Sequence, residues 1–147
     1  MSENHMQVSM RSISKNEALA RMMIAAFAAQ LDPTIEELAD IKTAVSEAVT
    51  NAIVHGYECR DGEIVMLAEY AGRLLTVEIS DKGKGIADVE RAREPFFTTL
   101  PEGDRSGMGF TVMETFMDTL KVTSTPGEGT TVRMTKVIMS GNGPKET

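Results

Sequence analysis

The sequence has few cysteines, few aromatic residues and no long apolar run. Among 147 residues there is one cysteine, no tryptophan, and an aromatic share of 5%. Cys59 has no partner for an internal disulfide and no Cys or His near it at metal-ligand spacing, which indicates a free thiol in a reducing compartment. The most apolar stretch, residues 22–31, is too short to span a bilayer, and the N-terminus lacks the pattern of a signal peptide. We therefore expect a soluble, cytoplasmic protein that does not contact membranes.

An excess of positive charge is also missing. The 15 basic and 22 acidic residues give a net charge of −7 and an isoelectric point near 4.9. Binding to a phosphate backbone requires a basic face, so direct nucleic-acid binding is not expected, and proteins or small molecules are the more suitable partners. The length and the 41% hydrophobic content fit one domain over residues 1–139, followed by a polar tail over 140–147 that we predict to be disordered.

Hydrophobic periodicity predicts the order β-α-α-β-β-(short α)-loop-α-β-β. Both long helices open with capping-box spacing, at Ser14–Glu17 and at Thr34–Glu37. This order predicts an α/β protein of the α+β kind, a two-layer sandwich with helices on one face of a mixed, mainly antiparallel sheet. The expected elements are strand 6–10, helices 14–31 and 34–56, hairpin 63–70 with 74–80, short helix 88–93, helix 110–119, and hairpin 121–125 with 130–138.

The second helix carries Glu47, Asn51 and His55 at successive turns, along one edge of its apolar stripe. An Asn amide oxygen is a suitable ligand for Mg²⁺, and a carboxylate one turn away can accept the proton of an attacking hydroxyl. A bare Glu-x-x-x-Asn is common on solvated helix edges, so this pair alone favours the structural interpretation. His55 is interpreted as a residue that complements the helix dipole at the C-terminal end.

Two glycine motifs follow. Asp81 ends an apolar strand and precedes Gly83 and Gly85, so its carboxylate can accept a hydrogen bond from an exocyclic amine such as that of adenine, while the glycines let the backbone approach a flat base. An ordinary tight turn explains this motif equally well. Gly107 and Gly109 precede a helix, where exposed N–H groups and the helix dipole favour an anion.

Arg105 and Ser106 add two donors beside the second glycine motif, and the segment before it, residues 96–104, has no periodicity. That segment is interpreted as a loop able to close over a nucleotide, although an ordinary surface loop has the same composition. Taken together, the three motifs predict binding of ATP and Mg²⁺. The phosphate loop with Gly-Lys-Ser/Thr and the motifs of common protein kinases are absent from the sequence.

These motifs resemble those of the GHKL superfamily, whose members share the Bergerat ATP-binding fold. The Glu47–Asn51 helix is similar to its N box, and the glycine motifs at Asp81 and at Gly107 are similar to its two glycine boxes. Within the superfamily, residues 46–57, 95–99 and 105–111 resemble the anti-sigma serine kinases, and residues 25–34 resemble their sporulation branch. The similarity runs from about residue 7 to residue 137.

The resemblance implies a homodimeric anti-sigma factor that holds a sporulation sigma factor in an ATP-dependent complex. It also implies a protein serine/threonine kinase that phosphorylates a serine of an anti-anti-sigma partner and so releases the sigma factor. Glu47 is then the catalytic base, Asn51 the Mg²⁺ ligand, Asp81 the adenine contact, and Arg21 the contact for both protein partners. The other implied contacts of ATP or ADP are Gly83, Gly85, Ile86, Thr98, Thr99, Arg105, Ser106, Gly107, Met108, Gly109, Phe110 and Thr130.

The sequence departs from the family pattern at Leu100 and Gly103 in the loop and at Lys82 and Lys84 in the first glycine box. These differences concern loop closure and phosphate contacts, and they leave the base and the metal ligand in place. The alternative interpretations are a general-stress type of anti-sigma kinase and a nucleotide-gated binding module without kinase activity.

Overall fold

The structure is a computed structural model that describes residues 2–94 and 109–139. The expected loop over residues 96–104 and the expected tail over 140–147 lie outside these residues. In the part that is described, no helix is long and apolar enough to cross a membrane.

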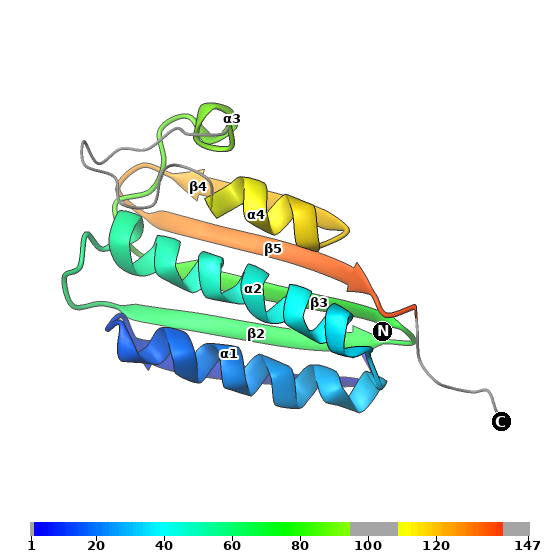
Figure 1. Cartoon of the computed structure of the whole chain (residues 1–147). Coiled ribbons are helices and arrows are strands. Elements are labelled where there is room, and N and C mark those ends of the chain that lie inside the picture. Colours follow the sequence, from blue (N-terminus) through cyan, green and yellow to red (C-terminus); the bar gives the residue numbers. More distant parts are fainter. Residues whose placement is uncertain (1, 95–108, 140–147) are drawn as a thin grey trace, which may run out of the picture.

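One five-stranded sheet forms the back layer of the molecule (Figure 1). Its strands lie in the order β1-β2-β3-β5-β4, and the four pairings between neighbours are all antiparallel. The α+β two-layer fold is therefore confirmed, although the sheet has no parallel pair among the described strands where a mixed sheet was expected. The strands are β1 Asn4–Arg11, β2 Glu63–Ala71, β3 Leu74–Asp81, β4 Thr119–Thr125 and β5 Gly129–Val137.

The helices cover one face of this sheet (Figure 1). Helix α1 spans Lys15–Ala28, α2 spans Ile35–Asn51 and α4 spans Gly109–Phe116, while the single-turn helix α3, Val89–Ala92, lies beside β4. Because α2 packs between α1 and α4, its apolar stripe is covered from three sides: by each flanking helix and by the sheet beneath it.

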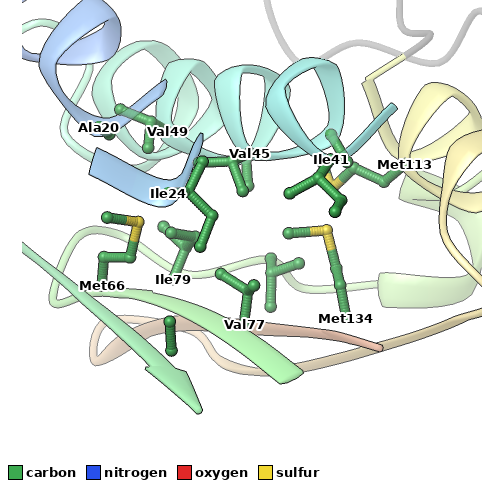
Figure 2. Close-up of a cluster of buried hydrophobic side chains, with 14 of the residues drawn as sticks. Ala20, Ile24, Ile41, Val45, Val49, Met66, Val77, Ile79, Met113 and Met134 are labelled. Atoms are coloured by element: carbon green, nitrogen blue, oxygen red, sulfur yellow. The ribbon is translucent and has the colours of Figure 1, made fainter. Parts of the chain in front are cut away.

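The core lies between this helical layer and the sheet. Ile24 of α1 and Val45 of α2 point toward Met66, Val77 and Ile79 of the sheet (Figure 2). All five are at most 2% exposed. Removing such side chains from water is the main stabilising contribution to the fold, at about 25 cal/mol per Å² of apolar surface. This packing fixes the position of α2, on which the Glu47 and Asn51 motif depends.

The two predicted capping boxes have different outcomes. At α2 both hydrogen bonds are present: the Glu37 N–H donates to Thr34 Oγ1, and the Thr34 N–H donates to Glu37 Oε1, each at 3.0 Å. At α1 the prediction is wrong, because Ser14 has helical backbone angles and its side chain makes no capping hydrogen bond. The Glu17 carboxylate instead accepts hydrogen bonds from Arg21 and from Ser46 of α2, so it joins two helices.

Candidate functional site

A cavity of about 430 Å³ lies where the end of α2, the loop after β3, the start of α4 and strand β5 meet. This volume is within the range of small-molecule sites, which are clefts of roughly 300–1,000 Å³. The cavity wall combines apolar side chains with a small number of polar groups. Its lining residues are Ala48, Asn51, Ala52, His55, Gly56, Ile79, Asp81, Lys84, Gly85, Ile86, Ala87, Asp88, Arg91, Ala92, Gly109, Phe110, Pro126, Thr130 and Val132.

The C-terminal end of α2 continues as one turn of π-helix over Ala52–Gly56. Such turns are rare in proteins, and many of those known lie at functional sites. Gly56 packs directly on the Asp81 side chain, since a Cβ atom at this position would lie 2.9–3.0 Å from the carboxylate atoms. Sequence reasoning identified Gly56 only as the end of the helix. Its second role depends on a contact between residues 25 positions apart, which no local pattern reveals.

Asp81 is the last residue of β3 and pairs with Thr130 of β5 across the sheet. Its Oδ1 atom accepts a hydrogen bond from the Gly83 N–H at 2.8 Å. Burial raises the pKa of the Asp81 carboxyl above its usual value, and hydrogen bonds from the backbones of Gly83 and Thr130 oppose this effect. A partly buried carboxyl group in a mainly apolar cavity is typical of a ligand-binding position.

The first glycine motif folds tightly against its surroundings. A Cβ atom on Gly83 would lie 2.1 Å from the Gly56 carbonyl oxygen, and one on Gly85, where φ is +77°, would lie 2.3 Å from the Thr125 carbonyl oxygen. The Lys84 N–H also donates to the Gly56 carbonyl at 2.9 Å. Both glycines are therefore needed for close backbone packing, and of the two it is Gly85 that lines the cavity.

Asn51 lines the cavity beside the start of α4. A Cβ atom on Gly109 would lie 3.0 Å from both amide atoms of Asn51, so the glycine leaves room for this side chain. Phe110, the next residue of α4, is buried and forms part of the wall. Glu47, one turn before Asn51, is half-buried and is not among the lining residues.

The donor chemistry around Asn51 fits Mg²⁺. Across residues 2–94 and 109–139, no group of three or more His, Cys, Asp or Glu side chains is arranged to hold a metal ion. Magnesium does not require such a group, because it keeps several waters and binds through one or two protein oxygens together with substrate phosphates. The Asn51 amide oxygen can supply one protein ligand of this kind.

The structure brings most of the described candidate residues to one place. Asn51, Asp81, Gly85, Gly109 and Thr130 line the same cavity although they come from four separate segments. Ile86 and Phe110 also line it. The candidates outside the described residues are Thr98, Thr99, Arg105, Ser106, Gly107 and Met108, together with Leu100 and Gly103 of the loop.

Arg21 lies away from this cavity, on α1. Its Nη1 atom is 2.7 Å from Glu17 Oε2, and its side chain is 40% exposed, so the residue is accessible but held by an ion pair. Because Glu17 also binds Ser46, which directly precedes Glu47, the Arg21 surface is connected through one carboxylate to α2.

Two cationic side chains at the cavity were not identified as site residues from the sequence. Lys84 lines the wall and its Nζ atom lies 3.1 Å from Glu58 Oε2, while Arg91 reaches the cavity from α3. Lys84 stood out only as an unusual residue in the glycine motif, and Arg91 gave no signal, because its position depends on how the short helix α3 packs.

Comparison with known proteins agrees with this geometry. The histidine kinase-like ATPase domain family matches residues 13–136. The chain belongs to this family, and the fold class with its Bergerat-type topology is thereby confirmed. Membership in a family of ATPase domains implies that the protein binds a nucleotide.

Two relatives of high sequence identity place the chain more closely within this family. The chain is 62% identical over 137 residues to a protein of Thermoanaerobacter sp. (strain X514) named Anti-sigma F factor, covering 93% of this chain and 96% of that protein. It is 52% identical over 142 residues to the Anti-sigma F factor of Pasteuria penetrans, covering 95% of each. Within the ATPase family the chain therefore belongs to the anti-sigma F factors, which confirms the expected resemblance to anti-sigma factors.

Solved structures support the fold. The RsbU and RsbW domains of Rv1364c from Mycobacterium tuberculosis align with a TM-score of 0.67 at 21% identity, covering 92% of this chain and 32% of that one. The catalytic domain of histidine kinase ThkA aligns with a TM-score of 0.57 at 14% identity, covering 92% of this chain and 97% of that one. At these identities the likeness concerns the fold alone.

Proposed function

We propose that this protein is an anti-sigma factor that sequesters a sporulation sigma factor when ATP is bound and phosphorylates a serine of an anti-anti-sigma partner. The single observation that carries the proposal is the cavity, which gathers Asn51, Asp81, Gly85, Gly109 and Thr130 from separate segments. The relatives at 52–62% identity are anti-sigma F factors by name, and they support the anti-sigma part of the proposal.

In the proposed mechanism, Asp81 accepts a hydrogen bond from the exocyclic amine of adenine while Ile86 and Val132 contact the base. The Asn51 amide oxygen would hold Mg²⁺, and the ion would supply neutralisation of the charge on the phosphates. Glu47 orients the partner's serine hydroxyl or accepts its proton, and the hydroxyl oxygen attacks the γ-phosphorus as ADP leaves. The partner's serine must enter from the side of α2 that carries Glu47, since this carboxylate does not line the cavity.

Arg21 is proposed as the shared contact for both protein partners, which then compete for one surface of α1. The protein is further proposed to act as a homodimer and in the cytoplasm. These statements rest on the family resemblance, and the exposed part of the Arg21 side chain is compatible with the first of them.

The decisive experiment compares Glu47→Gln with the unchanged protein. The variant should bind ATP normally and lose phosphotransfer by roughly 10²–10⁴-fold, because the amide cannot accept the proton. Calorimetry with ATP and transfer of labelled phosphate to the partner measure the two effects separately. Near-normal transfer would remove Glu47 from the mechanism.

A nucleotide-gated binding module without kinase activity is the second candidate, favoured by the position of Glu47 outside the cavity wall. It predicts ATP-dependent binding of the sigma factor by a protein that transfers no phosphate at all. The same transfer assay on the unchanged protein separates the two functions.

A further inference from the structure

Ser124, a half-buried residue of β4, makes three hydrogen-bond contacts through one hydroxyl group, and two of them are with residues of the cavity wall. The Ile86 N–H donates to Ser124 Oγ at 2.7 Å. Ser124 Oγ donates to the Gly129 carbonyl at 3.0 Å and lies 2.8 Å from Thr130 Oγ1. Ile86 and Thr130 both line the cavity, whereas Ser124 stands behind them.

The number of protons available decides the direction of these hydrogen bonds. A serine hydroxyl has one proton and two lone pairs. All three contacts are satisfied together only when Ser124 donates to Gly129, accepts from the Ile86 N–H and accepts from the Thr130 hydroxyl. If Ser124 donated to Thr130 instead, the carbonyl of the buried Gly129 would lose this donor, which is unfavourable for a buried polar group.

The satisfied arrangement fixes what Thr130 presents to a ligand. Its proton is directed to Ser124, so only the lone pairs of Oγ1 remain for the cavity. Thr130 is the register partner of Asp81, whose carboxylate is also an acceptor. Two neighbouring acceptors suit an exocyclic amine, which has two N–H donors, and they disfavour a carbonyl oxygen at the same place.

We propose that Ser124 is a positioning residue that holds Thr130 as a hydrogen-bond acceptor and thereby makes the cavity select a 6-amino purine over a 6-oxo purine. This proposal rests on the proposed function, because it assumes that the base of a nucleotide lies between Asp81 and Thr130. It adds a residue and a rule of specificity that Asp81 alone does not provide.

Ser124 also has a structural role that the test must separate. Together with the Gly127 N–H, which donates to the Lys84 carbonyl at 2.6 Å, it fastens the loop after β3 to the β4–β5 hairpin. Loosening this attachment should weaken the binding of all purine nucleotides by the same factor. Releasing the Thr130 proton should instead change the ratio of affinities for amino and oxo bases, because Thr130 can then rotate and donate to a carbonyl.

The experiment measures the affinities of ADP and IDP for the full chain by calorimetry at fixed salt and Mg²⁺. IDP replaces the 6-amino group of adenine by a carbonyl, protonates N1 and adds no 2-amino group. Ser124→Ala should reduce the preference for ADP over IDP by about fivefold to tenfold, the equivalent of one neutral hydrogen bond. Ser124→Thr keeps the hydroxyl and should keep the preference.

Two further variants serve as controls. Gly127→Ala strains a residue at φ +81° and perturbs the same attachment without touching Thr130, so it should weaken ADP and IDP by the same factor. In a Thr130→Val background, Ser124→Ala should produce no additional change in the ratio, because Ser124 acts through Thr130.

An unchanged ADP/IDP ratio in Ser124→Ala, with ADP still bound, would overturn the proposal and leave the proposed function intact. Failure of the unchanged protein to bind ADP would overturn both. If Ser124→Ala does not fold, Ser124→Cys provides the same comparison, because a thiol is a weak donor and acceptor.

Discussion

Replacement of Asp81 by Asn separates the binding role of this side chain from its effect on stability. Asn is nearly isosteric with Asp, and its Oδ1 atom can still accept the Gly83 N–H that lies 2.8 Å away in the structure. The substitution removes the negative charge and replaces one acceptor oxygen by an NH₂ donor. An amine of adenine then faces a donor, while the carbonyl of hypoxanthine or guanine faces a suitable partner.

The expected loss of ADP affinity follows from the kind of hydrogen bond removed. A hydrogen bond to a charged group contributes about 1.5–3 kcal/mol, which corresponds to roughly a 10- to 150-fold increase in Kd. Affinity for IDP should fall less or rise. Calorimetry with both nucleotides measures the difference, and an unaltered ratio of the two affinities would refute the adenine contact.

Stability should change in the opposite direction. Because burial raises the pKa of the folded Asp81 carboxyl above its unfolded value of about 3.8, the folded state holds this proton more tightly. The stability of the unchanged protein therefore falls as pH rises from 3.8 through the raised pKa, and this contribution is constant above it. Asn does not titrate, so the variant lacks this decrease.

As pH increases to neutrality, the free energy of unfolding of Asp81→Asn should therefore rise relative to that of the unchanged protein. Since the carboxyl is partly hydrated, and since the Thr130 N–H loses part of its acceptor, we expect a net gain near the lower end of the roughly 0.5–2 kcal/mol seen for single stabilising substitutions. Urea unfolding across the pH range measures it, with the ligand-free protein. If the unchanged protein instead becomes more stable relative to the variant as pH rises, the argument from burial is refuted.

Two further substitutions test the metal ligand and the partner surface. Asn51→Ala should abolish the part of ATP affinity that depends on Mg²⁺, together with phosphotransfer, and unchanged titrations with and without Mg²⁺ would show the metal assignment to be wrong. If Arg21 is a central contact, Arg21→Ala should lower the affinity for the sigma factor and for the anti-anti-sigma protein by about tenfold or more, and the affinity for ADP should stay unaltered. Its effect on stability should be only about 0.3–0.5 kcal/mol, because an i,i+4 ion pair that is only partly buried is weak.

Much of the fold could be predicted from local patterns. Apolar, β-branched runs predicted the strands that became β2 and β3 to within one residue at their ends, and the Thr34–Glu37 spacing predicted a capping box that is present. The same spacing at Ser14–Glu17 failed because the Glu17 carboxylate has stronger partners in Arg21 and Ser46. Local spacing cannot detect such competition, since Ser46 lies 29 residues away.

Asn51, Asp81 and Gly109 could be predicted as site residues because each belongs to a short motif whose spacing suits nucleotide binding. The missed residues, Gly56, Arg91 and Ser124, have ordinary local explanations as a helix end, a solvated cation and a strand hydroxyl. Their relation to the site appears only in the folded chain, where Gly56 contacts Asp81, Ser124 contacts Thr130, and Arg91 of α3 lines the cavity.

A substitution at Gly56 tests whether a residue from another segment supports the candidate site. The π-helical turn brings its Cα against the Asp81 carboxylate and its carbonyl against Gly83, so one residue supports both the candidate base contact and the loop that follows it. In Gly56→Ala the added methyl group would lie 2.9–3.0 Å from the Asp81 side chain, which must then move.

Gly56→Ala should therefore weaken ADP binding through displacement of Asp81, although helix propensity alone would make Ala the better residue by up to about 1 kcal/mol. In an Asp81→Ala background the obstructing carboxylate is gone, and the same substitution should cost little further affinity. Calorimetry of the single and double variants measures this coupling. Equal losses from Gly56→Ala in both backgrounds would mean that the contact with Asp81 is not the reason for glycine at this position.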